Sequence, residues 1–295
     1  MKQPKFDAGE PFNFTGLTDQ TYEKAKAIIF PVPYSSTTYW NPGTKFGPQA
    51  LIEASRHLEL FDLELKLDIS SKLGIYTLDP LAPSKNSPEE VVEQIDQVVS
   101  QLFADGKFPV TLGGEHSIAL GPIRAAAKKF KNLSVLQIDA HTDLRDEYEG
   151  TRFHHGCVMG RVVRDLKLPV TQVGIRSVSE EEMGFIKKSK REKYIFYAPD
   201  LPMKKILKTL KQNVYLSFDL DGLDPAIMSA TGTPEPGGLS FYQVLDLIKA
   251  VAKRRNLVGL DIVELSPLPG ISAPNFLAAK LAYKIIGYSL IKEIR

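Results

Sequence analysis

Several features that define other classes of protein are scarce in this sequence. The 295 residues include a single cysteine, Cys157, which can form neither an internal disulfide nor a thiolate cage for a metal. The net charge is only +2, which is too small to gather nucleic acid or an anionic membrane surface. These absences predict a protein of a reducing compartment, the cytoplasm, with a small molecule as its ligand.

Long apolar runs and nucleotide-binding motifs are also missing. The longest apolar runs, such as residues 27–30, fall far short of the roughly 18 residues that a membrane span requires. The N-terminal segment, residues 1–14, has no apolar stretch that resembles a signal peptide. No G-x-G-x-x-G motif follows an apolar run, so nothing indicates a dinucleotide site. The composition, with 43% hydrophobic and 24% charged residues, is that of an ordinary globular protein.

Short apolar runs alternate with helical patterns along the chain, which is typical of βαβ units around a mostly parallel sheet. Most runs lack polar alternation, as expected for strands that helices cover on both faces. The predicted strands span residues 27–30, 108–112, 133–138, 170–175, 194–197, 214–218 and 257–263. No repeat or long linker divides the sequence, so we predict one α/β domain over residues 1–295.

Two helix starts and one basic run have simple structural interpretations. Ser87, with Pro88 and Glu90 after it, predicts an N-cap with a capping box. Ser240 is expected to cap the next long amphipathic helix in the same way. The basic run at 187–193 follows an acidic helix start, so a solvated helix C-terminus explains it better than a nucleic-acid patch does.

Most of the histidines lie close together in the chain, next to predicted strands. His116 follows the strand 108–112 and two glycines, and His141 follows the strand at 133–138. Asp139 and Asp143 flank His141 at a spacing of two residues. Residues at i, i+2 and i+4 of an extended chain face the same way, so these three side chains can converge on one point.

Two more predicted strands end in acidic residues. Asp219 and Asp221 follow the strand at 214–218, and Glu264 follows the strand at 257–263. Two carboxylates this close resist joint ionisation unless a cation neutralises them. In a parallel α/β sheet the carboxyl ends of the strands are where ligands bind. The sequence therefore predicts one shared metal site at this edge of the sheet.

A structural role explains single residues better than it explains the whole set. His57 on an early helix is interpreted as an ordinary surface or core residue, and Asp224 or Asp221, taken singly, as a turn residue. Structural roles do not explain the set of two histidines and four aspartates at strand ends, because buried carboxylates need partners. Oxygen-rich ligands with a minority of imidazole favour Mn²⁺ over Zn²⁺. Four aspartates match two divalent ions, which lie about 3.5 Å apart in two-metal sites.

Five motifs follow one another in the chain: GGEHS at 113–117, DAHTD at 139–143, SFDLDGLDP at 217–225, GTPEPGG at 232–238 and DIVELSP at 261–267. Together with the segments at 42–55 and 278–288, they resemble the ureohydrolase family of arginases and agmatinases, and agmatinases most. The resemblance covers nearly the whole chain. It implies a three-layer α/β/α sandwich with an eight-stranded, mostly parallel sheet, two Mn²⁺ ions per chain, and a homo-oligomer, either a trimer or a hexamer.

The same resemblance implies a role for each site residue. One ion would be held by His116, Asp139, Asp143 and Asp219, and the other by Asp139, His141, Asp219 and Asp221, with Asp139 and Asp219 bridging. Glu264 would pair with the substrate guanidinium, and Thr233 would line the same pocket. His155, which precedes Gly156, matches the family's proton-shuttle histidine better than His154 does.

The loop at 144–156 and the GTPEPGG motif predict the substrate. In arginases this loop has Asn, Ser and Thr groups that bind the substrate's α-carboxylate and α-amine, whereas here it is acidic and includes Glu147. Together with Glu235 of the motif and His154, this favours agmatine, a guanidine with a cationic tail, as the source of urea and putrescine. Arg145 and Arg152 leave arginine open, and N1-aminopropylagmatine or guanidinobutyrate are further alternatives.

Two other functions are weaker interpretations of the same residues. A metal-stabilised scaffold without turnover would need neither His155 nor Glu264. The one-zinc deacetylase branch of the fold lacks the full set of six ligands that this sequence contains.

Overall fold

The computed structural model describes residues 9–38, 40 and 42–293, so most of the N-terminal segment considered above lies outside the described residues. In the described part, eight strands form one sheet in the order β4-β1-β5-β10-β9-β6-β7-β8, and every neighbouring pair is parallel. The strands are β1 (Ala27–Val32), β4 (Ile75–Thr77), β5 (Phe108–Gly113), β6 (Leu133–Ile138), β7 (Val170–Ile175), β8 (Ile195–Tyr197), β9 (Asn213–Asp219) and β10 (Asn256–Val263). The predicted α/β class and eight-stranded sheet are confirmed.

Each of the seven strands predicted from apolar runs is present, with its ends shifted by no more than two residues. The edge strand β4 was not predicted, because a run of three residues has no readable periodicity. An antiparallel hairpin of β2 (Phe61–Asp62) and β3 (Leu67–Asp68), outside the main sheet, was missed for the same reason.

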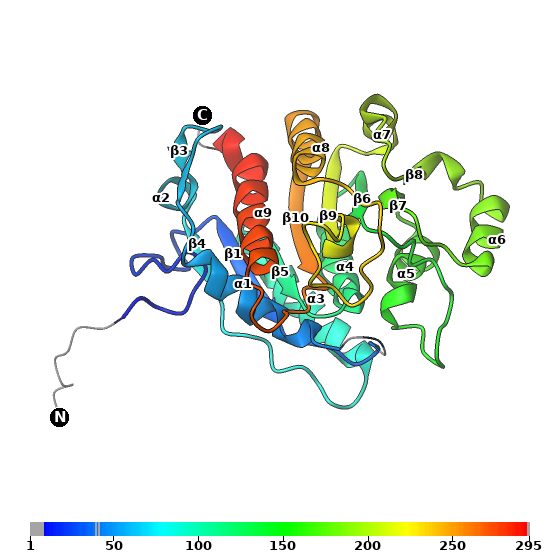
Figure 1. The fold of residues 1–295 in the computed structure, drawn as a ribbon, viewed down its shortest axis with the longest axis horizontal. Helices are drawn as coiled ribbons and strands as arrows, with labels where there is room; N and C mark the ends of the chain where they lie inside the picture. Colours follow the sequence, from blue (N-terminus) through cyan, green and yellow to red (C-terminus); the bar gives the residue numbers. More distant parts are fainter. Residues whose placement is uncertain (1–8, 39, 41, 294–295) are drawn as a thin grey trace.

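Helices cover both faces of the sheet (Figure 1). On one face lie α1 (Gly47–Ser55), α8 (Phe241–Arg254) and α9 (Ala273–Leu290), and on the other lie α3 (Pro88–Ala104), α4 (Leu120–Lys129) and α5 (Val158–Arg164). The remaining α-helices of the described chain are α2 (Ile69–Leu73), α6 (Glu180–Lys188) and α7 (Met203–Thr209). Alternate residues of one strand reach the two apolar cores: Ala27 and Ile29 of β1 pack in one, and Phe30 and Val32 in the other. The result is a three-layer sandwich.

The predicted helix starts are present, with one difference. Ser240 caps α8 and forms a capping box with Gln243. Ser87 caps α3 by accepting a hydrogen bond from the Glu90 amide. The Glu90 carboxylate instead accepts hydrogen bonds from Ser84 and the Asn86 side chain, so the capping box predicted at α3 does not form.

The basic run at 187–193 begins in the last turn of α6, as predicted. It is not solvated throughout, because the buried Arg191 donates a hydrogen bond to the Val170 carbonyl.

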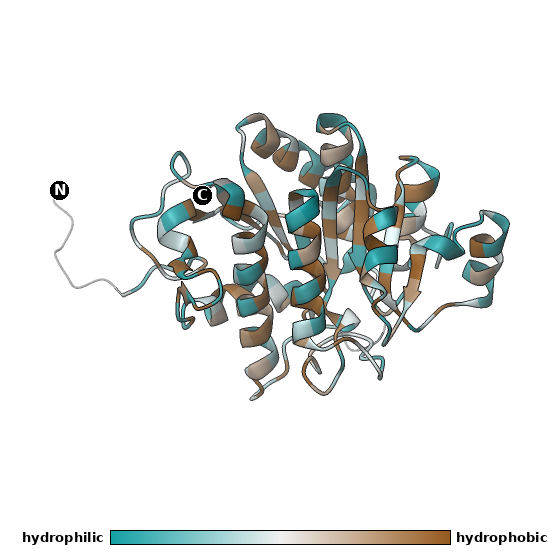
Figure 2. Ribbon diagram, turned by 90° about the horizontal axis from the view of Figure 1, so that it is seen from above, coloured by the Kyte–Doolittle hydropathy of each residue, from teal (hydrophilic) through white to brown (hydrophobic). Residues whose placement is uncertain are grey.

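Apolar residues concentrate in the strands and on the inner sides of the helices (Figure 2). Among the helices of the described chain, none has the length and apolar character to cross a membrane. The four central strands, β5, β10, β9 and β6, are consecutive in the sheet, so their carboxyl ends lie side by side. This edge is the one that the sequence predicts as the ligand site.

Candidate metal centre

Four neighbouring strands deliver acidic or imidazole side chains to one edge of the sheet. Asp219 is the last residue of β9, and Asp139 and Glu264 directly follow β6 and β10. After β5 the chain must turn sharply to present His116. Gly114 permits this turn, because a Cβ at that position would lie 1.7 Å from the Tyr34 carbonyl oxygen.

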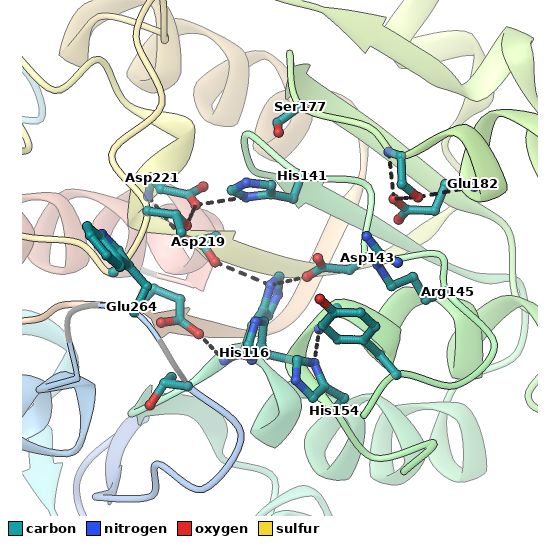
Figure 3. Close-up of a pocket in the computed structure, with 18 of the residues that line it drawn as sticks. His116, His141, Asp143, Arg145, His154, Ser177, Glu182, Asp219, Asp221 and Glu264 are labelled. Atoms are coloured by element: carbon teal, nitrogen blue, oxygen red, sulfur yellow. Dashed lines mark hydrogen bonds and ion pairs between the residues drawn. The ribbon is translucent and has the colours of Figure 1, made fainter. Parts of the chain in front are cut away.

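One group of ligands gathers around the His116 ring (Figure 3). His116 Nδ1 lies 3.1 Å from Asp139 Oδ2, 2.9 Å from Asp143 Oδ2 and 3.4 Å from Asp219 Oδ2. All four side chains are buried, and Nδ1 makes no hydrogen bond of normal geometry. An imidazole nitrogen and three carboxylate oxygens that converge in this way form a binding site for a cation.

A second group shares Asp139 with the first. His141 Nδ1 lies 3.0 Å from Asp221 Oδ2 and 3.6 Å from Asp139 Oδ1. The ligand atoms of Asp139, His141 and Asp221 all lie within 4.8 Å of one another, as do those of His116, Asp139 and Asp219. We call the six side chains of the two groups together the metal centre: His116, Asp139, His141, Asp143, Asp219 and Asp221. The structure thus brings all six predicted ligands together, in two groups that meet at Asp139.

Two of the ligands, Asp143 and Asp221, do not lie in the extended backbone that the sequence predicted. Asp143 has a φ of 50°, in the left-handed region, so the chain from β6 is not extended through this residue. Asp221 lies in a 3-10 turn that follows β9, in which its amide donates to Asp219 Oδ1 at 2.9 Å. Glu264 also has a positive φ, 65°. Strained backbone of this kind concentrates at functional sites.

Burial and neighbouring acids raise the pKa values of three carboxylates in or beside the metal centre. Burial, followed by the charge of Asp139, raises the pKa of Asp143 to about 7. Burial and the charge of Glu115 raise the pKa of Glu264 to about 8. The pKa of Asp219 is raised well above its usual value by burial and then by Asp221 and Asp139. The described chain places no lysine around this cavity to neutralise these charges.

The donor set fits hard or borderline divalent cations. The ligand atoms are carboxylate oxygens and two imidazole nitrogens, a set that suits Mn²⁺. Cys157 is buried and forms no disulfide. Burial raises the pKa of its thiol to about 12. The residues present therefore fit the two divalent ions expected from the sequence.

A cavity of about 160 Å³ opens onto the metal centre, which is room for a small molecule. Several residues singled out in the sequence line it, among them Thr233, His154, His155 and Glu264. Thr233 Oγ1 lies 3.5 Å from Asp221 Oδ2. Glu147 and Glu235 are not among the lining residues, so their contact with substrate stays a prediction.

The two adjacent histidines differ in their surroundings. His154 is buried, and its Nδ1 accepts a hydrogen bond from the Gly156 amide at 3.1 Å. His155 is half-buried, and its Nδ1 lies 2.9 Å from the Thr37 hydroxyl. Burial, with the charges of the neighbouring imidazoles, lowers the pKa of His155 to about 3, so its ring is neutral at pH 7.

Sequence reasoning missed several residues of the site. Tyr148 lines the cavity and packs against Arg145, whose guanidinium carbon lies 4.3 Å from the ring centroid. Arg145 also lies 3.7 Å from Glu181 Oε2, so two neighbours already engage this cation. Glu115 and Thr37 lie behind His116 and His155. The sequence signal for both residues was their position after a strand, β1 for Thr37 and β5 for Glu115.

The chain is similar to known proteins over nearly its whole length. Residues 25–287 match the model of the Arginase family. An N(1)-aminopropylagmatine ureohydrolase of Synechocystis sp. is 38% identical over 297 residues, which cover 96% of this chain and 95% of that protein. An agmatinase of Halalkalibacterium halodurans is 36% identical over 255 residues, 85% of this chain and 87% of the other. The structure of the agmatine ureohydrolase of Thermoplasma volcanium matches with a TM-score of 0.85 and 33% identity over 97% of each chain.

Proposed function

Because the chain belongs to the arginase family, and is therefore a ureohydrolase that acts on guanidino compounds, we propose that it hydrolyses agmatine to urea and putrescine with two Mn²⁺ ions. The observation that supports the metal requirement most directly is the convergence of two imidazoles and four buried or nearly buried aspartates on one point, with Asp139 in both groups. When bound, the metal pair supplies the nucleophile, since divalent cations lower the pKa of water toward neutrality.

The chain's own residues bind the substrate and move the proton. Glu264 is buried and one of its oxygens, Oε1, accepts a hydrogen bond from the His116 amide at 2.6 Å. Its other oxygen is left for the substrate guanidinium, which pairs with carboxylates through its planar set of N–H donors. Thr233 lines the same cavity beside Asp221. His155, neutral before the reaction, takes up the proton that the attacking water loses and gives it to the amine that leaves as the carbon–nitrogen bond breaks.

The charge around the cavity supports a substrate with a cationic tail. Arg145 could pair with a carboxylate, but Glu181 and Tyr148 already engage it. In the loop at 144–156, Asp146 forms ion pairs with Arg161, Arg164 and Arg152, so Asp146 organises the loop. Glu149 extends toward His154, with 3.8 Å between its Oε2 and His154 Nε2. An amine tail is therefore accommodated more easily than the α-carboxylate of arginine.

A second substrate has specific support. The relative from Synechocystis sp. and one from Thermus thermophilus, 36% identical over 92% of this chain, are both named N(1)-aminopropylagmatine ureohydrolases. This molecule is agmatine with a longer cationic tail, so the same charges would bind it.

Urea release tests the proposal directly. The full chain, loaded with Mn²⁺, is assayed with agmatine, N1-aminopropylagmatine, arginine and guanidinobutyrate. We expect the highest kcat/KM with agmatine, and a value with arginine at least about 100-fold lower, since leaving a charge without a partner in a buried site costs several kcal/mol. A higher value with N1-aminopropylagmatine would transfer the assignment to the second substrate. Comparable values with arginine would overturn the choice of a cationic tail.

Metal analysis tests the cofactor and the alternatives from other classes. We expect two Mn²⁺ per chain after loading and dialysis. One tightly held Zn²⁺ would favour the deacetylase-type centre, and two bound ions without urea from any guanidine would favour a scaffold.

Three broader features remain proposals. We propose that residues 1–295 form one domain, supported by a sheet whose strands extend from Ala27 to Val263. We place the enzyme in the cytoplasm, which the unpaired Cys157 favours. Light scattering would test the expected trimer or hexamer.

A further inference from the structure

A buried carboxylate lies behind the candidate proton shuttle and is not itself a metal ligand. Glu115 is fully buried. Its Oε2 accepts hydrogen bonds from the backbone amides of Ser36 at 2.5 Å and Thr37 at 2.7 Å. Its Oε1 accepts from the hydroxyls of Thr37 at 2.9 Å and Ser117 at 2.5 Å. Four donors thus surround the two carboxylate oxygens, which leaves Glu115 in the role of acceptor.

The Thr37 hydroxyl connects this carboxylate to His155. Its oxygen lies 2.9 Å from His155 Nδ1 and 3.2 Å from the His155 backbone nitrogen. A hydroxyl has one hydrogen to donate and two lone pairs that accept. Because a carboxylate can only accept, the hydroxyl hydrogen points to Glu115, and the two lone pairs then face His155. The ring nitrogen facing Thr37 must therefore carry a hydrogen.

We propose that Thr37 and Glu115 are positioning residues, which hold His155 as the Nδ1–H tautomer so that Nε2 is the atom that exchanges the proton. The expected effect on kcat rests on the proposed function. The tautomer of the His155 ring does not depend on turnover. When Nε2 takes up a proton, the positive charge on the ring is stabilised by the Glu115 carboxylate one hydroxyl away. A carboxylate that orients a histidine in other enzymes acts in the same way.

The opposite arrangement is chemically distinct. If Glu115 were protonated, it could donate to Thr37, and Thr37 could then donate to Nδ1. The neutral ring would carry its hydrogen on Nε2 and could not accept a proton there. The two arrangements predict opposite tautomers, which makes them separable by experiment.

The tautomer is measured by nitrogen NMR of the full chain with ¹⁵N-labelled histidine, freed of paramagnetic Mn²⁺. The His155 signals are assigned with a His155→Asn variant. We expect a protonated Nδ1 and an unprotonated Nε2 in the wild type near pH 7. Thr37→Val, which keeps the shape but removes the hydroxyl, should shift the ring toward a mixture of tautomers. Thr37→Ser should restore the wild-type signals. A wild-type ring with its hydrogen on Nε2 would overturn the inference.

Kinetics of the Mn²⁺-loaded variants test the consequence for turnover. We expect Thr37→Val to lower kcat about 10- to 100-fold, part of the about 10²- to 10⁴-fold that general acid–base catalysis contributes. KM and the Mn²⁺ content should stay within about twofold, and Thr37→Ser should recover most of kcat. The matched control is Ser35→Ala in the same loop, whose hydroxyl contacts Thr38 Oγ1 instead. It should leave both the tautomer and kcat unchanged.

The outcomes separate this inference from the proposed function. Equal losses of kcat in the Val and Ser variants would show that packing matters and the hydroxyl does not, which contradicts the inference. If no guanidine yields urea, the proposed function fails, but the NMR result still decides whether Thr37 and Glu115 set the tautomer.

Discussion

Two acidic clusters in the described part of the chain differ in what neutralises them. In the first, the hairpin cluster, Asp62 and Glu64 of the β2–β3 hairpin contact two lysines, one from α9 and one from α8. Lys284 Nζ of α9 lies 3.0 Å from Asp62 Oδ2 and 2.9 Å from Glu64 Oε2, and Lys249 of α8 also pairs with Glu64. In the metal centre the acids face one another and two imidazoles. The hairpin cluster joins parts of the fold, whereas the metal centre needs cations from outside.

The pKa values show the same difference. Burial alone would raise the pKa of Glu64, but hydrogen bonds from Lys249, Tyr288 and Lys284 outweigh it and lower the pKa to about 2. In the metal centre, burial and neighbouring acids raise the pKa of Asp143 to about 7. The exposed Glu64 has its counterions supplied by the chain, whereas the buried Asp143 has other acids as neighbours, so the two clusters indicate opposite roles.

Removal of metal should have the largest effect, because it removes the counterions of one cluster alone. We expect a chelator to abolish urea release, and added Mn²⁺ to restore it and to raise Tm. Metal at about 1,000 times its Kd adds about 4 kcal/mol to the free energy of unfolding. Urea assays and calorimetry measure the two effects. An Asp219→Asn variant is the control and should respond weakly. Turnover that survives complete metal removal would contradict the proposed mechanism.

Glu264→Gln tests an acid that borders the metal centre without belonging to either ligand group. We expect urea release to fall by about 10²-fold or more, because losing one partner of a buried charge pair costs about 2–5 kcal/mol. The Mn²⁺ content should stay at two ions per chain, measured by atomic absorption. Unchanged turnover would show that Glu264 does not bind the guanidinium, and loss of metal would assign it to the cation site instead.

The strand ends of the metal centre were predictable from the sequence, because wholly buried strands such as β6 are mostly apolar, lack regular polar alternation and are followed by an acid. The turns that bring Asp143 and Asp221 into place were not, since a left-handed φ in a non-glycine residue has no strong sequence signal. The contact between Thr37 and Glu115 joins residues 78 positions apart, beyond any local pattern. For the same reason the hairpin cluster was not predicted, since Lys284 and Asp62 meet only in the folded chain.

Lys284→Met removes a counterion from the hairpin cluster. We expect the free energy of unfolding to fall by about 3–5 kcal/mol, because the buried Asp62, 3% exposed, loses its cation. The kcat of the folded variant should not change, since no residue of this cluster lines the cavity at the metal centre. Denaturant unfolding followed by urea assays measures both.

The matched control for this variant is Lys280→Met, one turn earlier in α9. Lys280 Nζ donates to the Glu59 carbonyl at an exposed position, so the loss should be about 0.5 kcal/mol or less. The double variant Lys284→Met with Asp62→Asn should recover part of the stability. No recovery would mean that Lys284 acts through packing and not through its charge.

The smallest expected effect is the acid sensitivity due to Glu64. Its pKa falls from 4.5 to about 2 on folding, so its ionised form stabilises the fold above about pH 4.5, and this contribution is lost as the pH falls toward 2. Glu64→Gln should therefore lose stability less steeply than the wild type between about pH 5 and pH 3, measured by denaturant unfolding. Glu89→Gln, at an exposed position on α3, should keep the wild-type slope. Equal slopes for all three proteins would show that the lysines do not hold Glu64 ionised, and the two clusters would then differ in geometry but not in charge.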